Sequence, residues 1–70
     1  MKYAAATNAD SEVLGGERVF TGTLVPVSSL FDHLEGGDSI DDILAGFPSV
    51  SREQVIAVLE ESRAHFLQPA

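Results

Sequence analysis

The stretch SIDDILAGFPSVSREQ, residues 39–54, contains two helix-start signals that lie twelve residues apart. Ser39 and Ser51 each precede an apolar run and are followed three positions later by an aspartate or a glutamine, the spacing of a capping box. The Gly-Phe-Pro breaker at 46–48 separates the two signals, because Pro48 disfavours helix at the residue before it. The stretch therefore predicts a short helix, a turn and a longer helix, the skeleton of a helix-turn-helix.

A further helix is predicted just before this unit. Pro26 has its φ preset for a first helical turn, and apolar residues follow it at helical spacing. The paired glycines at 36–37 supply the left-handed residue that commonly closes a helix. The expected core faces of the three helices are Val27, Leu30, Phe31 and Leu34, then Ile40, Ile43 and Leu44, then Val55, Val58, Leu59 and Phe66.

Residues 18–25 favour a small β element. Two short β-branched segments, 18–20 and 23–25, are joined by a glycine-containing turn, which predicts a hairpin. We expect this hairpin to pack on the helices or to pair with the same ribbon of a second copy. Residues 1–12 are small and polar without periodicity, so we expect a mobile leader there. The expected domain covers residues 13–67, with a tail at 68–70. The fold class is mainly α, a three-helix helix-turn-helix bundle with a short N-terminal β-hairpin.

The size of the chain predicts that it does not act alone. Seventy residues make one small domain with a limited core, and the sequence has no cysteine to reinforce it. The usual remaining reinforcement is a second copy of the chain or a different partner, and we expect a homodimer. The net charge of −7 repels nucleic acid and favours a basic protein partner.

Several classes of function are disfavoured by the sequence. No apolar run is long enough for a signal peptide or a membrane span, so we expect a cytoplasmic protein with no membrane contact. His33 and His65 lack a second ligand at metal-binding spacing, and a calcium loop counted from Asp32 would place Leu34 and Gly36 at ligand positions. No nucleophile elbow or phosphate loop is visible, so we expect no enzyme, no cofactor and no metal.

The start of the third helix offers candidates for contact with duplex DNA. Ser51, Arg52 and Gln54 lie where a helix-turn-helix reaches base edges, and Arg18 on the ribbon adds a fourth candidate. The competing interpretation is that Gln54 caps the helix and Arg52 is a solvated charge. Arg18 would then pair with Glu17 of a neighbouring copy or stay exposed.

Two motifs resemble the domain-of-unknown-function family numbered 433. These are Gly-Thr-x-Val-Pro-Val at 22–27 and Phe-Pro-x-Val-Ser at 47–51, within a likeness that runs from Glu12 to about Phe66. That family is similar to small antitoxin-like proteins, often encoded beside a toxin of the nuclease-fold type. The resemblance implies a ribbon and a helix-turn-helix, and an antitoxin that masks a toxin and binds its own promoter. Leu24 stands where a basic residue is common.

We therefore expect a homodimeric, acidic binding protein that neutralises a basic toxin. The residues predicted to contact the partner lie on the last helix: Ile56, Glu60, Arg63 and Phe66. Two alternatives stay open, a sequence-specific DNA-binding regulator and a structural or assembly module with no toxin partner.

Overall fold

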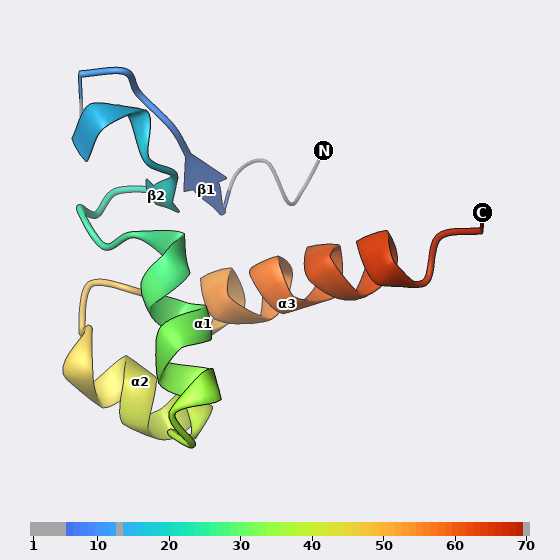
Figure 1. Cartoon of the computed structure of the whole chain (residues 1–70). Coiled ribbons are helices and arrows are strands. Elements are labelled where there is room, and N and C mark those ends of the chain that lie inside the picture. The colour runs from blue at the N-terminus through green and yellow to red at the C-terminus, as the bar shows by residue number, and fades with distance from the viewer. Residues whose placement is uncertain (1–5, 13, 70) are drawn as a thin grey trace.

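The computed structural model describes residues 6–12 and 14–69 and confirms a mainly helical fold (Figure 1). Two short strands pair in an antiparallel sheet, and three helices follow them. The elements, in chain order, are β1 (Thr7–Asn8), the 3-10 turn η1 (Leu14–Gly16), β2 (Val19–Phe20), α1 (Val27–Glu35), α2 (Ile40–Gly46) and α3 (Arg52–Phe66).

Both predicted capping boxes are present. The Ser39 hydroxyl accepts from the Asp42 amide at 3.1 Å, and the Asp42 carboxylate accepts from the Ser39 amide at 3.2 Å. The Ser51 hydroxyl accepts from the Gln54 amide at 3.1 Å, and the Gln54 side-chain oxygen accepts from the Ser51 amide at 2.9 Å. These bonds satisfy amides that a helix start leaves without partners, so α2 and α3 begin where the sequence indicates.

The core lies where the three helices meet β2. Leu30 of α1, Ile43 of α2 and Val55 of α3 are buried there. The other members of this core cluster are Phe20, Val50 and Val58. The remaining expected core residues are only half-buried at its margin, apart from one at the end of α3.

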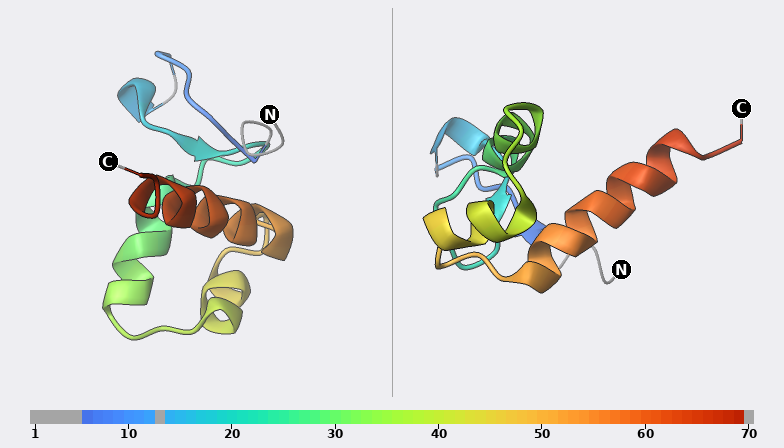
Figure 2. Two further views of the ribbon diagram at one scale, coloured as in Figure 1. Left: turned by 90° about the vertical axis from the view of Figure 1, so that its right-hand side faces the viewer. Right: turned by 90° about the horizontal axis from the view of Figure 1, so that it is seen from below.

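Phe66 corrects the predicted core, because its side chain is 82% exposed. It continues the helical spacing of Val55 and Val58, but α3 has by then run past α1 and α2 (Figures 1 and 2). Periodicity indicates which side of a helix faces the body but not where the body ends. The distal half of α3 is therefore a projecting arm, residues 60–67.

The expected hairpin of residues 18–25 is shorter than predicted, because residues 23–25 do not form a strand. The strand partner of β2 is β1, with Thr7 opposite Phe20. The chain reverses at Thr21 and Gly22, and the Phe20 amide donates to the Val25 carbonyl at 3.0 Å. The Thr23 hydroxyl supports this reversal, because it donates to the Phe20 carbonyl at 2.8 Å and accepts from the Val25 amide at 3.0 Å. The second arm of the expected hairpin is therefore reduced to a single bridge, between Val19 and Pro26, beside these local side-chain bonds.

Part of the expected mobile leader therefore belongs to the fold. Ala6 and Thr7 are buried, and the Ala6 carbonyl accepts from the Thr21 amide at 2.9 Å. The other edge of β2 is bridged at Val19 to Pro26. Both edges of β2 are thus occupied within one chain and are not available to pair with a second copy. Residues 1–5 of the predicted leader lie outside the described residues.

Candidate functional site

The exposed start of α3 carries the candidates for DNA contact, and its charge is mostly negative. The Arg52 guanidinium forms an ion pair with Asp41 of α2. Asp42 and Glu53 lie in the first turns of the same two helices. The starts of α2 and α3 therefore carry three carboxylates and one arginine, which is already paired, at the place where a helix-turn-helix meets a phosphate backbone. Such a surface provides little positive field for a duplex.

Gln54, the second base-contact candidate, is bonded at both ends of its side-chain amide. Its oxygen accepts from the Ser51 amide, and its nitrogen donates to the Thr21 carbonyl at 2.9 Å and the Ala6 carbonyl at 3.3 Å. Gln54 therefore connects the first turn of α3 to Ala6, just before β1, and to the turn after β2. Contact with a base edge would require these bonds to break. A glutamine at this position, rather than a glutamate, is the sequence signal for these donor bonds, because only the amide can donate.

Arg18, the third basic candidate, is bonded within its own chain. Its Nη1 donates to the Thr7 hydroxyl at 3.1 Å, so it ties β2 to the buried residue of β1. Glu17, its expected partner from a neighbouring copy, instead accepts from the Ser28 hydroxyl at 3.0 Å. The Arg18 side chain also forms part of the groove described next.

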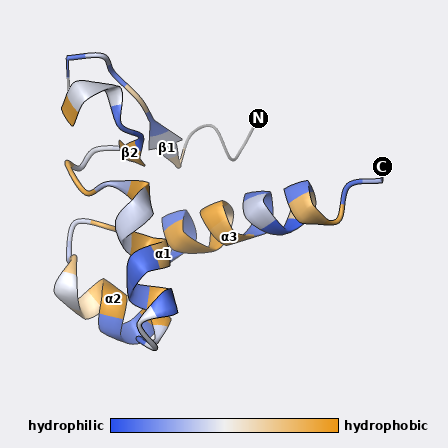
Figure 3. Cartoon of the chain, viewed as in Figure 1, coloured by the Kyte–Doolittle hydropathy of each residue, from blue (hydrophilic) through white to orange (hydrophobic). Residues whose placement is uncertain are grey.

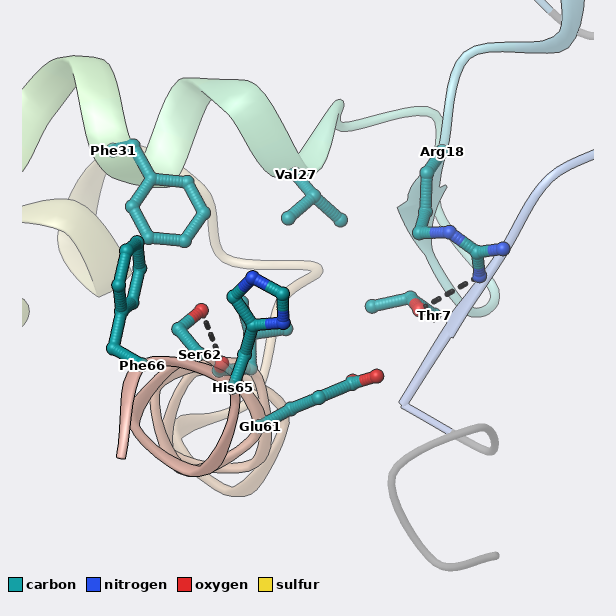
Figure 4. Close-up of a pocket in the computed structure, with 9 residues that line it drawn as sticks. Thr7, Arg18, Val27, Phe31, Glu61, Ser62, His65 and Phe66 are labelled. Carbon is teal, nitrogen blue, oxygen red and sulfur yellow. Dashed lines mark hydrogen bonds between the residues drawn. The ribbon is translucent and has the colours of Figure 1, made fainter. Parts of the chain in front are cut away.

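A groove runs between α1 and the projecting arm of α3 (Figure 4). It is open and encloses about 330 Å³. Val27 and Phe31 of α1 form its apolar side, and Phe66 borders it from α3, with Arg18 and Glu61 as charged neighbours. The sequence placed both α1 residues in the core, and the groove could not be found from it because it depends on where α3 leaves the body.

The four predicted partner-contact residues lie on two sides of α3. Ile56, Glu60 and Arg63 are exposed and follow one another at intervals of four and three residues, which places them on one face. Phe66 lies on the side that continues Val55 and borders the groove. Sequence reasoning missed Leu67, which is 65% exposed and continues the first face four residues after Arg63.

The two histidines are not brought together. His33 Nδ1 lies 2.7 Å from Asp38 Oδ2, and its ring meets Phe47 edge-on with centroids 5.3 Å apart. His65 is exposed on the arm. Within residues 6–12 and 14–69, no three His, Cys, Asp or Glu side chains gather as metal ligands. No helix in the same part of the chain is long and apolar enough to cross a bilayer.

A comparison with protein-family models places the chain in a family. The model for proteins of unknown function, DUF433, matches residues 8–60. The chain belongs to the DUF433 family. The DUF433 match covers β2, α1, α2 and the first part of α3, and it ends at the base of the projecting arm. Arg63, Phe66 and Leu67 lie beyond it. Neither curated proteins nor solved structures give a match to this DUF433 chain.

Proposed function

We propose that this chain is a non-enzymatic, homodimeric antitoxin-like protein of the cytoplasm that binds and neutralises a basic, nuclease-type toxin. The supporting observation is the exposed Phe66 beside the apolar groove, on a chain whose net charge is −7. An exposed aromatic residue next to a groove is typical of a partner-binding surface, since such anchors contribute much of the binding energy.

Charge supports a basic protein as the ligand of this surface. Eleven acidic residues against four basic ones attract a cationic partner over long range and raise the rate of encounter. Glu61 and Arg18 both lie at the groove, so the attraction comes from the net charge of the whole chain. A basic helix or loop that places an apolar side chain between Phe31 and Phe66 would satisfy both features of the surface.

Duplex DNA, including the promoter of its own gene, is the alternative ligand of a helix-turn-helix. The exposed Arg52 favours it, but Arg52 is paired with Asp41, and Gln54 is bonded at both ends. Asp41→Asn removes one carboxylate and releases the guanidinium. If DNA is the ligand, this variant binds promoter duplex more tightly than the wild type, and Arg52→Ala binds it less tightly.

The experiment for the toxin function uses the protein encoded by the neighbouring open reading frame, provided that it is basic and cleaves RNA. The purified chain is expected to form a stoichiometric complex with it and to abolish cleavage. Phe66→Ser is expected to weaken this inhibition. Leu24→Ser is the matched control, because Leu24 is 70% exposed but lies on the turn after β2.

The function is contradicted if cleavage continues at a molar excess of the wild-type chain. It is also contradicted if the two serine variants inhibit equally well, because the groove then has no part in binding. Binding of promoter duplex that falls steeply with salt, without inhibition of the nuclease, would assign the chain to DNA-binding regulators instead.

A further inference from the structure

The outer face of α3 carries a stripe of four exposed residues, called here the α3 stripe: Ile56, Glu60, Arg63 and Leu67. Their intervals of four, three and four residues keep all four on one face over about 16 Å of helix. Leu67 caps the helix, and its amide donates to the Arg63 carbonyl at 3.0 Å, so it holds its place in the stripe. Figure 3 shows apolar colour in the first half of α3 and again at its carboxyl end, with mostly hydrophilic colour between them.

We infer that the α3 stripe is a self-complementary interface that pairs two copies of this chain in antiparallel orientation. The order of the stripe is apolar, acidic, basic, apolar. With a two-fold axis between Glu61 and Ser62, residue n of one copy lies level with residue 123 minus n of the other. Ile56 then meets Leu67 of the second copy, and Glu60 meets Arg63 of the second copy, each contact occurring twice.

Charge selects this arrangement over the parallel one. A parallel pair would place Glu60 opposite Glu60 and Arg63 opposite Arg63, and like charges in contact oppose association. The antiparallel pair turns both contacts into ion pairs flanked by apolar contacts. Within the part of the chain that the structure describes, neither Glu60 nor Arg63 forms an ion pair. Both groups are therefore available to a second copy.

The fold leaves the α3 stripe exposed, and it does not leave the edges of β2 free for the strand pairing expected from the sequence. Both edges of β2 are occupied within the chain, so β2 is not free to pair with a second copy. The stripe also leaves the groove beside Phe66 open, because Phe66 lies on another side of α3. The inference rests on the homodimer that is part of the proposed function, and it assigns the surface through which that homodimer forms.

The test exchanges charges and measures association by sedimentation equilibrium. Glu60→Arg gives a stripe with two arginines, and Arg63→Glu gives a stripe with two glutamates. For each variant alone, the dimer dissociation constant is expected to rise at least about tenfold above that of the wild type. Mixed in equal amounts, the two variants are expected to form a heterodimer, because both ion pairs return, one with its original polarity and one with reversed polarity. The double variant carrying both changes is expected to dimerise like the wild type.

Glu61→Arg is the matched control, since it makes the same charge change at the neighbouring residue of α3, which faces the groove. It is expected to leave dimerisation unchanged. The inference is overturned if the two single variants fail to associate when mixed, or if Glu61→Arg weakens the dimer as much as Glu60→Arg. Loss of toxin binding in Glu60→Arg and Arg63→Glu without any loss of dimerisation would also overturn it, because the stripe would then belong to the toxin.

The outcomes separate this inference from the proposed function. If dimerisation is unchanged in Glu60→Arg and Arg63→Glu, the α3 stripe is not the interface, but the homodimer is not contradicted. A wild-type chain that stays monomeric overturns both the stripe and the homodimer. Failure to inhibit the basic nuclease, with the charge exchange behaving as expected, overturns the antitoxin function alone.

Discussion

The side-chain nitrogen of Gln54 donates a hydrogen bond to the Thr21 carbonyl at 2.9 Å, across thirty-three residues of sequence. The same nitrogen reaches the Ala6 carbonyl, while the oxygen caps α3. One side chain thus joins the start of the longest helix to the residue before β1 and to the residue after β2. Its position in a capping box and its reach to two carbonyls give it two separable roles.

Replacement of Gln54 is expected to destabilise the protein through both roles. Gln54→Ala should lower the free energy of unfolding by about 1–3 kcal/mol, because it removes a cap and two donor bonds. Gln54→Glu keeps the capping oxygen but turns a second oxygen toward two carbonyls, so it too should be less stable than the wild type. Urea unfolding measures both. A Gln54→Glu protein as stable as the wild type would show that the two carbonyl bonds contribute nothing.

Truncation of the core is expected to have the largest effect on stability. Leu30 is 1% exposed, so Leu30→Ala should cost about 2–5 kcal/mol in thermal or urea unfolding. That is a large share of the stability of a small domain. Leu24→Ala, on the exposed turn, should stay within about 0.5 kcal/mol of the wild type. Equal losses in the two variants would mean that Leu30 does not lie in the core described here.

The cap of α2 offers a third test, because a helix of seven residues depends strongly on its ends. Ser39→Ala should lower the free energy of unfolding by about 0.5–2 kcal/mol. Ser49→Ala, in the turn before α3, is the control, since the Ser49 hydroxyl has no hydrogen-bond partner among residues 6–12 and 14–69. An equal response of both variants in chemical unfolding would contradict the capping role of Ser39.

Salt is expected to weaken binding of the basic partner mainly through the association rate. Exposed charges on the chain raise the rate of encounter with a cationic partner. At 0.1 M salt, interactions between exposed charges more than about 10 Å apart are largely screened. Stopped-flow mixing of the chain with the basic nuclease should show an association rate that falls with salt, while the dissociation rate changes much less. An association rate that does not depend on salt would contradict the proposal that the charge of the chain attracts its partner.

Local signals predicted most of the helical part of the fold. Ser39, Ser51, Pro26 and Pro48 each act on a neighbouring turn, so the boundaries of all three helices follow from residues close in sequence. The sheet could not be predicted in this way, because the partner of β2 is Thr7, and nothing in its small polar neighbourhood indicates a strand. Pairing between distant segments depends on the finished body rather than on local pattern.

The candidate surfaces also differ in whether local sequence pattern could predict them. The exposed face of Ile56, Glu60 and Arg63 follows from helical spacing alone. The pairing of Arg52 with Asp41 and the groove beside Phe66 do not, since both depend on how α3 is placed against α1 and α2. Phe66 shows the limit most clearly, because its spacing indicates burial while its position beyond the body leaves it in solvent.

Because the arm projects beyond the body, hydrogen exchange of its amides will show whether a ligand is bound to it. Amides of its last two turns are shielded only by bonds inside the helix, whereas those near Val55 are also covered by the core. Deuterium uptake in the free chain should therefore be fastest toward the carboxyl end. A ligand that binds the arm will slow deuterium uptake by the amides it covers. The binding site can therefore be located before the ligand is identified.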